Sequence, residues 1–142
     1  MIRAVLDTNV LISAAVVKGG NPDRIVRQPP NPFEWLTSEY ILSEVADVLS
    51  RKHIQGKYGN PVTPKRQQRF LKTARTVATV VEVTSSVSAV PDDLKDNPIL
   101  ACGKDGGADY IVTADRHLLK LGRFEGIQIV TPAEFLATLR SQ

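Results

Sequence analysis

Short apolar runs alternate with longer segments of helical periodicity along the chain. Apolar runs rich in β-branched residues predict strands, and they occupy residues 2–6, 33–37, 79–83, 109–113 and 127–130. Apolar positions on one face, with capping residues in front, predict helices at 9–17, 21–28, 38–52, 64–77, 96–106, 117–121 and from 132 onward. This alternation predicts an α/β fold, a three-layer α/β/α sandwich around a mainly parallel central sheet of four to five strands.

Length and composition favour one globular domain. The 142 residues can enclose a single core, so the domain is expected to span 1–142. Hydrophobic residues make up 42% of the chain, and no apolar run approaches the about 18 residues that a membrane span needs. Strand-like sequence starts at once, so no signal peptide is expected, and the only cysteine, Cys102, is expected to be a buried apolar side chain. The sequence therefore predicts a cytoplasmic protein that does not bind membranes.

Two acids stand where predicted strands end. Asp7 closes the run 2–6 and opens the next helix, and Asp115 follows the run 109–113 by two residues. In a parallel sheet the carboxyl ends of the strands share one edge, and ligands of open α/β sheets bind there. Two strand-end acids that are far apart in sequence can therefore meet in space, and such a meeting is typical of a divalent-cation site.

Two further acids can reach the same edge. Glu44 lies about 40° beyond the apolar face of helix 38–52, so its carboxylate can point along the rim of the buried face. Asp96 stands at a predicted helix N-terminus, where the helix dipole favours the charged form. Each acid also has a plain structural interpretation: Glu44 as a solvated helix residue, and Asp96 and Asp115 as ordinary helix caps.

Pooled carboxylates need a cation. Acids that are packed together raise each other's pKa unless a positive charge lies between them. Oxygen ligands select Mg²⁺ or Mn²⁺, and no Cys/His cluster with zinc spacing is present. Such ions can activate water for attack on a phosphodiester. The net charge of +3 and the isoelectric point near 9.2 then imply a basic remaining surface, which suits a polyanionic substrate.

One helix is a candidate for that basic surface. In segment 64–77, Lys65, Arg69 and Lys72 recur at i, i+4 and i+7 and share a face, opposite an apolar stripe. This face is interpreted either as a phosphate-binding ridge for RNA or as a solvated side of an amphipathic helix.

Five segments resemble the PIN-domain family of small metal-dependent ribonucleases, which includes many bacterial and archaeal toxins. They are VLDTNVLISA (5–14), TSEYILSEVADVL (37–49), KDNPILA (95–101), GADYIVTADRHLLKL (107–121) and IQIVTPAEFLATL (127–139). The closing segments are most similar to toxin components of toxin–antitoxin systems, the VapC-like ribonucleases. The resemblance implies a PIN-like nuclease domain that uses Mg²⁺ or Mn²⁺ to hydrolyse RNA, with a cognate antitoxin as partner and a homodimer as assembly.

The resemblance also assigns residues. It implies that Asp7, Glu44, Asp96 and Asp115 are the catalytic, metal-binding acids, with Asn9 and Thr113 as polar neighbours in the pocket. Asp93 is the second choice for the third acid, because it precedes Asp96 so closely. The polar, glycine-containing segment 101–105 indicates a short helix behind that acid.

Other functional classes remain open. A haloacid-dehalogenase-like phosphatase also begins with a strand-end acid, but it needs a second Asp where this chain has Asn9. A response-regulator receiver needs a mid-chain acceptor Asp and a late Lys, and neither is evident. The main alternative is a non-catalytic RNA- or protein-binding module on the same fold, because a fold does not determine a function.

Overall fold

Strands and helices alternate along the folded chain. A computed structural model describes residues 1–28, 32–51, 62–87 and 96–142, with only the backbone of Asp96. The elements are, in order, β1 (Ile2–Leu6), α1 (Thr8–Val16), α2 (Asn21–Val26), β2 (Phe33–Thr37), α3 (Glu39–Leu49), α5 (Pro64–Val77), β3 (Thr79–Val80), α6 (Asp96–Gly106), β4 (Tyr110–Val112), α7 (Arg116–Leu121), β5 (Arg123–Phe124), β6 (Ile127–Val130) and α8 (Pro132–Arg140).

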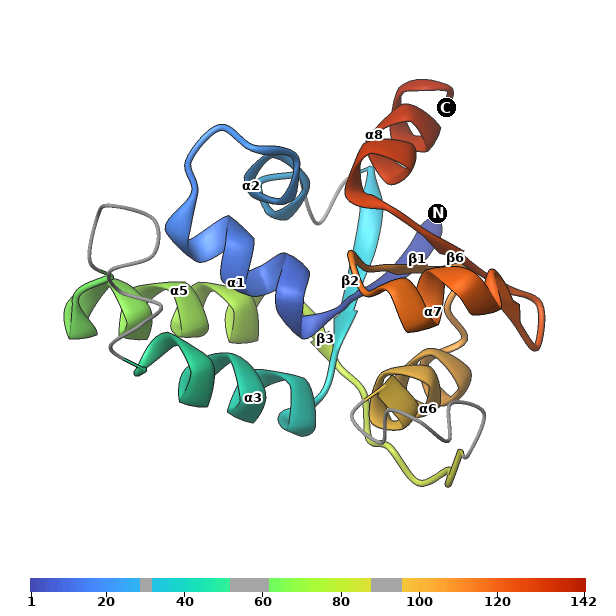
Figure 1. Cartoon of the computed structure of the whole chain (residues 1–142), viewed down its shortest axis with the longest axis horizontal. Coiled ribbons are helices and arrows are strands. Elements are labelled where there is room, and N and C mark those ends of the chain that lie inside the picture. The colour runs from blue at the N-terminus through green and yellow to red at the C-terminus, as the bar shows by residue number, and fades with distance from the viewer. Residues whose placement is uncertain (29–31, 52–61, 88–95) are drawn as a thin grey trace.

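The strands form one sheet in the order β3-β2-β1-β4-β6-β5. All neighbours are parallel except β5 and β6, which are antiparallel. From β1 the chain moves outward through β2 to β3, and then returns to the other side of β1 as β4 before moving outward again to β6 (Figure 1). The strand order therefore reverses between β1 and β4, and such a switch point opens a crevice at the carboxyl ends of the two strands.

Helices cover the sheet on both faces. Figure 1 shows α1, α2, α3 and α5 to the left of the strands and α6 and α7 to the right. On the α2 side, α8 packs against the sheet through Phe135, whose ring lies 5.0 Å from the ring of Phe33 and 5.7 Å from that of Tyr110. The predicted three-layer α/β fold is confirmed. None of the described helices has the length and apolar character that crossing a membrane requires.

Two strands differ from the prediction. Within the described residues the sheet has six strands, because the short strand β5 turns back onto β6 through Glu125 and Gly126, which both have positive φ angles. A two-residue strand is too short to show an alternating pattern, so the sequence did not predict it. β3 ends at Val80, although the β-branched run suggested a strand through 83. Beyond it the backbone N–H groups of Thr84 and Ser85 donate to Asp105 instead of to a strand, at 2.7 and 2.8 Å.

Helix α6 lies close to the sheet because of two glycines. A Cβ atom on Gly103 would lie 3.1 Å from Ile111, and one on Gly106 would lie 2.9 Å from Val81 and 3.0 Å from Leu36. Helix α6 has the predicted bounds, Asp96–Gly106, so the polar segment 101–105 does not shorten it, and its small residues allow the close approach. Cys102 on this helix is fully buried, as predicted, and burial raises the pKa of its thiol to about 12, so the thiol is a packing group and not a nucleophile.

Replacing one of these glycines with a larger residue should destabilise the packing of α6 on the sheet. Gly106→Leu is expected to lower the free energy of unfolding by about 1–3 kcal/mol, because the new side chain meets packed neighbours. Urea denaturation followed by circular dichroism measures the change. Lys104→Leu is the control, because Lys104 is exposed on the same helix, and its effect should stay within about 0.5 kcal/mol. Equal losses in the two variants would mean that close packing at Gly106 is unimportant.

A buried carboxylate closes the turn between α1 and α2. Asp23 is 7% exposed, and its oxygens accept hydrogen bonds from the backbone N–H of Gly19 at 2.8 Å and from Nε of Arg27 at 3.0 Å. Burial alone would raise the pKa of Asp23, but these hydrogen bonds and the charges of Arg27 and Lys18 outweigh it and hold that pKa below the ordinary 3.8.

The depressed pKa makes a prediction about stability and pH. Asp23→Asn is expected to lower the free energy of unfolding at neutral pH by about 1–3 kcal/mol, because a charged acceptor is lost. The folded-state pKa lies below the unfolded value, so the contribution is present above the unfolded pKa and is lost as the pH falls through the folded one. Urea denaturation of both proteins should show a gap near pH 7 that narrows below about pH 4. A gap independent of pH would argue against a contribution from the charge.

Candidate metal centre at the switch point of the sheet

Hydrogen bonds join the carboxyl ends of β1 and β4. Asp7 follows β1 and is 4% exposed. Its Oδ2 accepts a hydrogen bond from Oγ1 of Thr113 at 2.7 Å and a longer one from Nδ2 of Asn9 at 3.3 Å. The backbone N–H of Asp7 donates to the carbonyl of Val112 at 3.0 Å and so extends the pairing of the two strands. The carboxylate of Asp7 is thus held at the switch point by groups from both strand ends.

Asn9 and Thr113 also connect this carboxylate to Asp115. Oγ1 of Thr113 accepts a hydrogen bond from the backbone N–H of Asp115 at 3.0 Å. Oδ1 of Asn9 accepts one from the backbone N–H of Ala114 at 3.2 Å. The structure therefore brings four predicted site residues, Asp7, Asn9, Thr113 and Asp115, into one network. The Ala114 N–H carries no signal in the sequence, because any residue at that position would supply the same donor.

Both network acids also cap helices. Oδ1 of Asp7 accepts from the backbone N–H of Thr8 at 2.6 Å, at the start of α1. Oδ1 of Asp115 accepts from the backbone N–H groups of His117 at 2.7 Å and Leu118 at 3.4 Å, at the start of α7. The prediction that Asp115 caps a helix is therefore confirmed. Capping uses only Oδ1, so Oδ2 can still bind a metal ion. Helix N-termini favour the charged carboxylate that a metal ion needs.

Glu44 lies half-buried in the middle of α3. This helix begins at Ser38 directly after β2, which is the other parallel neighbour of β1, and it packs against α1. Within the described ranges Glu44 forms no ion pair and no hydrogen bond to Asp7 or Asp115. The helix that carries Glu44 thus begins at the carboxyl edge of the sheet. A metal-binding role for the Glu44 carboxylate stays a prediction.

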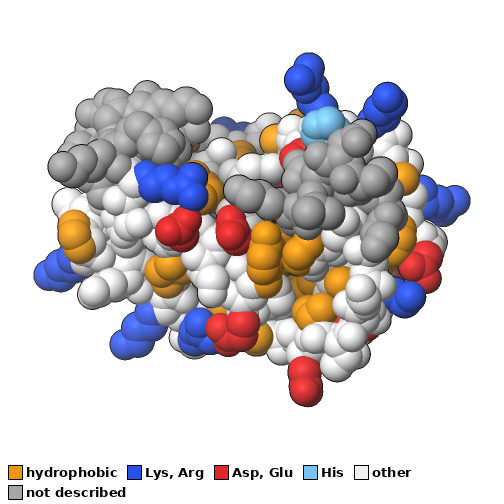
Figure 2. All heavy atoms as spheres, turned by 60° about the horizontal axis from the view of Figure 1, so that its bottom comes forward, with side chains coloured by type: hydrophobic (Ala, Val, Ile, Leu, Met, Phe, Trp, Pro, Cys, Tyr) orange, Lys and Arg blue, Asp and Glu red, His pale blue; other side chains and the backbone are white. Residues whose placement is uncertain are grey.

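Asp96 begins α6, while its side chain and all of Asp93 lie outside the described residues. The first turn of α6 lies at the same edge of the sheet, because Pro98 shares a surface hollow with Ser38 and Tyr40 at the start of α3. Figure 2 shows this side of the molecule, where acidic side chains lie beside a group of hydrophobic ones. The backbone position is therefore compatible with an acid that reaches the switch point.

Comparison with known proteins identifies the family. Residues 3–117 match the PIN domain, and this stretch includes all four candidate acids. The chain belongs to the PIN domain family. The fold of this PIN domain is similar to that of a chain in the crystal structure of VapBC2 from Rickettsia felis bound to a DNA fragment from their promoter, with a TM-score of 0.65 and 12% sequence identity. The similarity covers 92% of this chain and 98% of that chain. A search of curated proteins finds no match.

The groups at the switch point of this PIN domain suit a hard cation. Carboxylate oxygens of Asp7 and Asp115 and the side-chain oxygens of Asn9 and Thr113 are the donor types that Mg²⁺ and Mn²⁺ prefer. Among the side chains that the structure describes, no three His, Cys, Asp or Glu residues form a group that could hold a metal ion. The carboxylates of Asp93 and Asp96 are not among these side chains, and their part in a metal site stays a prediction.

The predicted basic residues lie exposed along α5. Lys65, Arg69 and Lys72 are all on the surface of this helix, and α5 packs against α3, which carries Glu44. Arg75 at the end of α5 is engaged elsewhere, because it donates two hydrogen bonds to the carboxylate of Glu39, at 2.6 and 3.1 Å. The ridge of Lys65, Arg69 and Lys72 thus stays a candidate RNA contact.

Proposed function

We propose that this PIN domain is a ribonuclease that depends on Mg²⁺ or Mn²⁺ and hydrolyses RNA phosphodiester bonds at the switch point between β1 and β4. Asp7, Glu44, Asp96 and Asp115 act as the catalytic acids and hold the metal. The observation that carries the proposal is the hydrogen-bond network from Asp7 through Thr113 to Asp115, at the sheet edge where α/β proteins bind ligands.

Each residue of the network has a physical role in this proposal. Thr113 and Asn9 hold the carboxylate of Asp7 in one orientation, so that it is preorganised for a cation. Asp115 is fixed through its backbone and presents the oxygen that does not cap α7. A bound divalent ion would polarise both the scissile phosphodiester and a water molecule. The residue types at the site fit that ion, and membership of the PIN family supports nuclease chemistry.

The partners follow from the same reasoning. The substrate is RNA, and the toxin–antitoxin setting of the structurally similar VapBC2 chain supports an antitoxin protein as the regulatory partner. In this proposal the protein acts in the cytoplasm as a homodimer. A non-catalytic binding module on the same fold would bind RNA or protein but would not turn it over.

Removal of the metal tests the chemistry. Treatment with EDTA is expected to stop cleavage of a labelled single-stranded RNA, and added Mg²⁺ or Mn²⁺ should restore it, because the acids alone cannot neutralise the developing charge. Gel analysis of the products measures both steps. Cleavage that survives exhaustive chelation would contradict a metal-dependent site, and binding without cleavage under all conditions would favour the non-catalytic module.

The basic ridge makes a separate prediction. If Lys65, Arg69 and Lys72 contact phosphates, each Ala substitution should reduce the slope of log K against log salt by about 0.7. Cleavage at saturating RNA should change little, since these contacts bind substrate and transition state alike. Fluorescence anisotropy at several salt concentrations measures the slope. An unchanged slope in the triple variant would show that the ridge is only a solvated face.

A further inference from the structure

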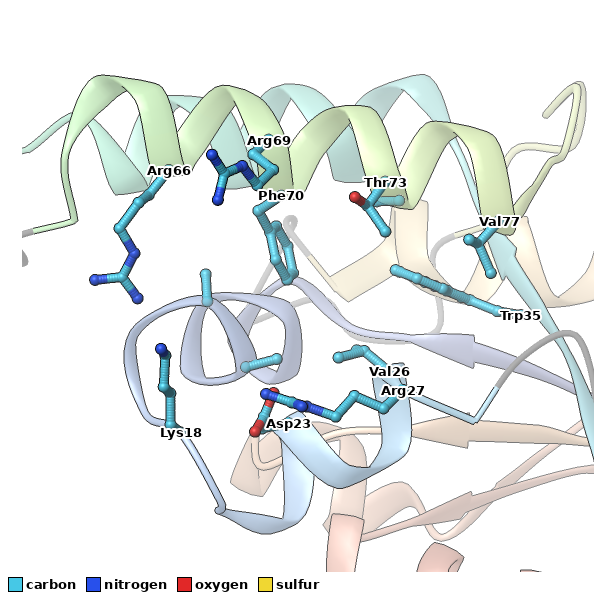
Figure 3. A pocket seen from close by; sticks show the side chains of 13 residues that line it. Lys18, Asp23, Val26, Arg27, Trp35, Arg66, Arg69, Phe70, Thr73 and Val77 are labelled. Carbon is cyan, nitrogen blue, oxygen red and sulfur yellow. The ribbon is translucent and has the colours of Figure 1, made fainter.

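A groove separates α5 from α1 and α2, away from the proposed metal site. It has a volume of about 490 Å³, and its walls come from these three helices, with Trp35 of β2 among the lining residues. Figure 3 shows Phe70 pointing from α5 into the groove toward α1, with Lys18 and Arg66 at one end and Trp35 at the other. The groove therefore combines an apolar interior with charged side chains at its mouth.

The charged side chains at the mouth are mostly cations. Lys18, Arg66 and Arg69 line the groove, and within the described part of the chain none of the three lies within ion-pair distance of a carboxylate. The lining acid, Asp23, is already engaged by Gly19 and Arg27. Three like charges around one opening repel each other, and an anion placed between them would relieve that repulsion.

The interior of the groove suits a flat, apolar group. Phe70 is half-buried, and its ring extends into the space between the helices (Figure 3). Val26 and Val77 supply further apolar surface around it. A nucleotide combines the two requirements of the groove, because its base stacks on aromatic rings and its phosphate binds cations.

We propose that this groove binds one nucleotide of a single-stranded RNA, with the base against Phe70 and the neighbouring phosphates at Lys18, Arg66 and Arg69. The inference rests on the proposed ribonuclease function and adds a substrate-binding subsite to it. The subsite adjoins the exposed ridge through Arg69, which lines the groove, whereas Lys65 and Lys72 do not.

The geometry connects the groove with the proposed cleavage site. Helix α1 begins directly after Asp7 and lines the groove with Ala14 and Ala15. At a rise of 1.5 Å per residue, about 10 Å along the helix axis separates Thr8 from Ala15, a distance that a short single strand can span. The cations continue from the groove onto the outer face of α5, and this continuity favours an extended polyanion over a compact acidic segment of a protein.

Fluorescence offers a direct test, because Trp35 is the only tryptophan of the chain and lines the groove. The full-length protein is titrated with a short oligoadenylate in EDTA, so that binding is measured without turnover. A saturable change in tryptophan fluorescence is expected. Its midpoint should match the dissociation constant from anisotropy of the labelled oligonucleotide.

Two variants separate the base contact from the phosphate contact. Phe70→Leu keeps an apolar side chain but removes the ring, and it should weaken binding about tenfold and raise the midpoint of the fluorescence change by the same factor. Arg66→Gln should reduce the salt slope by about 0.7. Lys120→Gln is the control, because it makes the same change of charge at an exposed position of α7, on the other face of the sheet. Its affinity for the oligonucleotide and its salt slope should equal those of the wild type. Thermal unfolding confirms that each variant is folded.

The outcomes separate this inference from the function on which it rests. Oligonucleotide binding with wild-type affinity and salt slope in both Phe70→Leu and Arg66→Gln would overturn the subsite, even if the protein cleaves RNA. A fluorescence response to an acidic peptide but not to RNA would also overturn it and would identify a protein-docking groove. If the groove binds RNA as described while Asp7→Asn leaves cleavage unchanged, the proposed catalytic site fails and the subsite stands.

Discussion

Asp7→Asn is expected to reduce the rate of RNA cleavage by about a hundredfold or more. The substitution keeps the shape of the side chain and an oxygen that can accept from Thr8, but it removes a negative charge from the centre of the network. A divalent ion contributes several kcal/mol of charge stabilisation, and each 1.36 kcal/mol corresponds to about a tenfold change in rate. Single-turnover cleavage at saturating Mg²⁺ measures the effect.

Asp109 provides the matched control for this experiment. It is an exposed acid that immediately precedes β4, and its Oδ2 accepts a hydrogen bond from the backbone N–H of Arg3 at 2.9 Å. Because it lies at the amino end of the strand that leads to Thr113, Asp109→Asn removes the same charge from the opposite edge of the sheet. Its cleavage rate should stay close to that of the wild type. Equal rates for the two variants would contradict the placement of the site at the carboxyl edge.

Asp96→Asn is expected to abolish turnover more completely than Asp93→Asn. The reason is position: Asp96 begins α6, whose first turn lies at the carboxyl edge of the sheet, and the helix N-terminus favours its charged form. The loss for Asp96→Asn should resemble that for Asp7→Asn, about a hundredfold or more, since both remove a proposed metal-binding acid. Parallel measurements of Mn²⁺ affinity show whether the loss arises at the metal.

The reverse order would assign the third acid to Asp93. Equal partial losses in both variants would indicate that the two carboxylates substitute for each other. If neither variant loses turnover fully, residues 93–96 do not belong to the site. The network of Asp7 and Asp115 would then need another acid as partner.

The approach of Asp7 to Asp115 was predictable from the sequence, because it depends on where two strands end. An apolar run that ends in an acid indicates a buried strand with a carboxylate at its carboxyl edge, and a parallel sheet brings such edges together. Asp7 and Asp115 needed only this rule, and the Thr113 contact at 2.7 Å shows how closely the strand ends approach. The reversal of strand order between β1 and β4 needed the structure, since no local pattern determines which strands become neighbours.

Other features depend on tertiary contacts that leave a weak or misleading signal in the sequence. The polar, glycine-containing segment 101–105 of α6 suggested a short helix, whereas Gly103 and Gly106 allow close packing on the sheet. The groove beside α5 was missed because its residues come from separate elements, Lys18 after α1, Trp35 in β2 and Phe70 in α5. Helical periodicity placed Phe70 on the apolar side of its helix, and only the structure shows that its ring extends into a groove.

The position of Mn²⁺ in crystals of this chain soaked in that ion tests the proposed metal site most directly. Anomalous scattering locates the metal independently of any assay. We expect a peak at the carboxyl edge between β1 and β4, within ligand distance of Asp7, and its disappearance in crystals of Asp7→Asn. A peak elsewhere on the chain, or one that persists unchanged in Asp7→Asn, would contradict it.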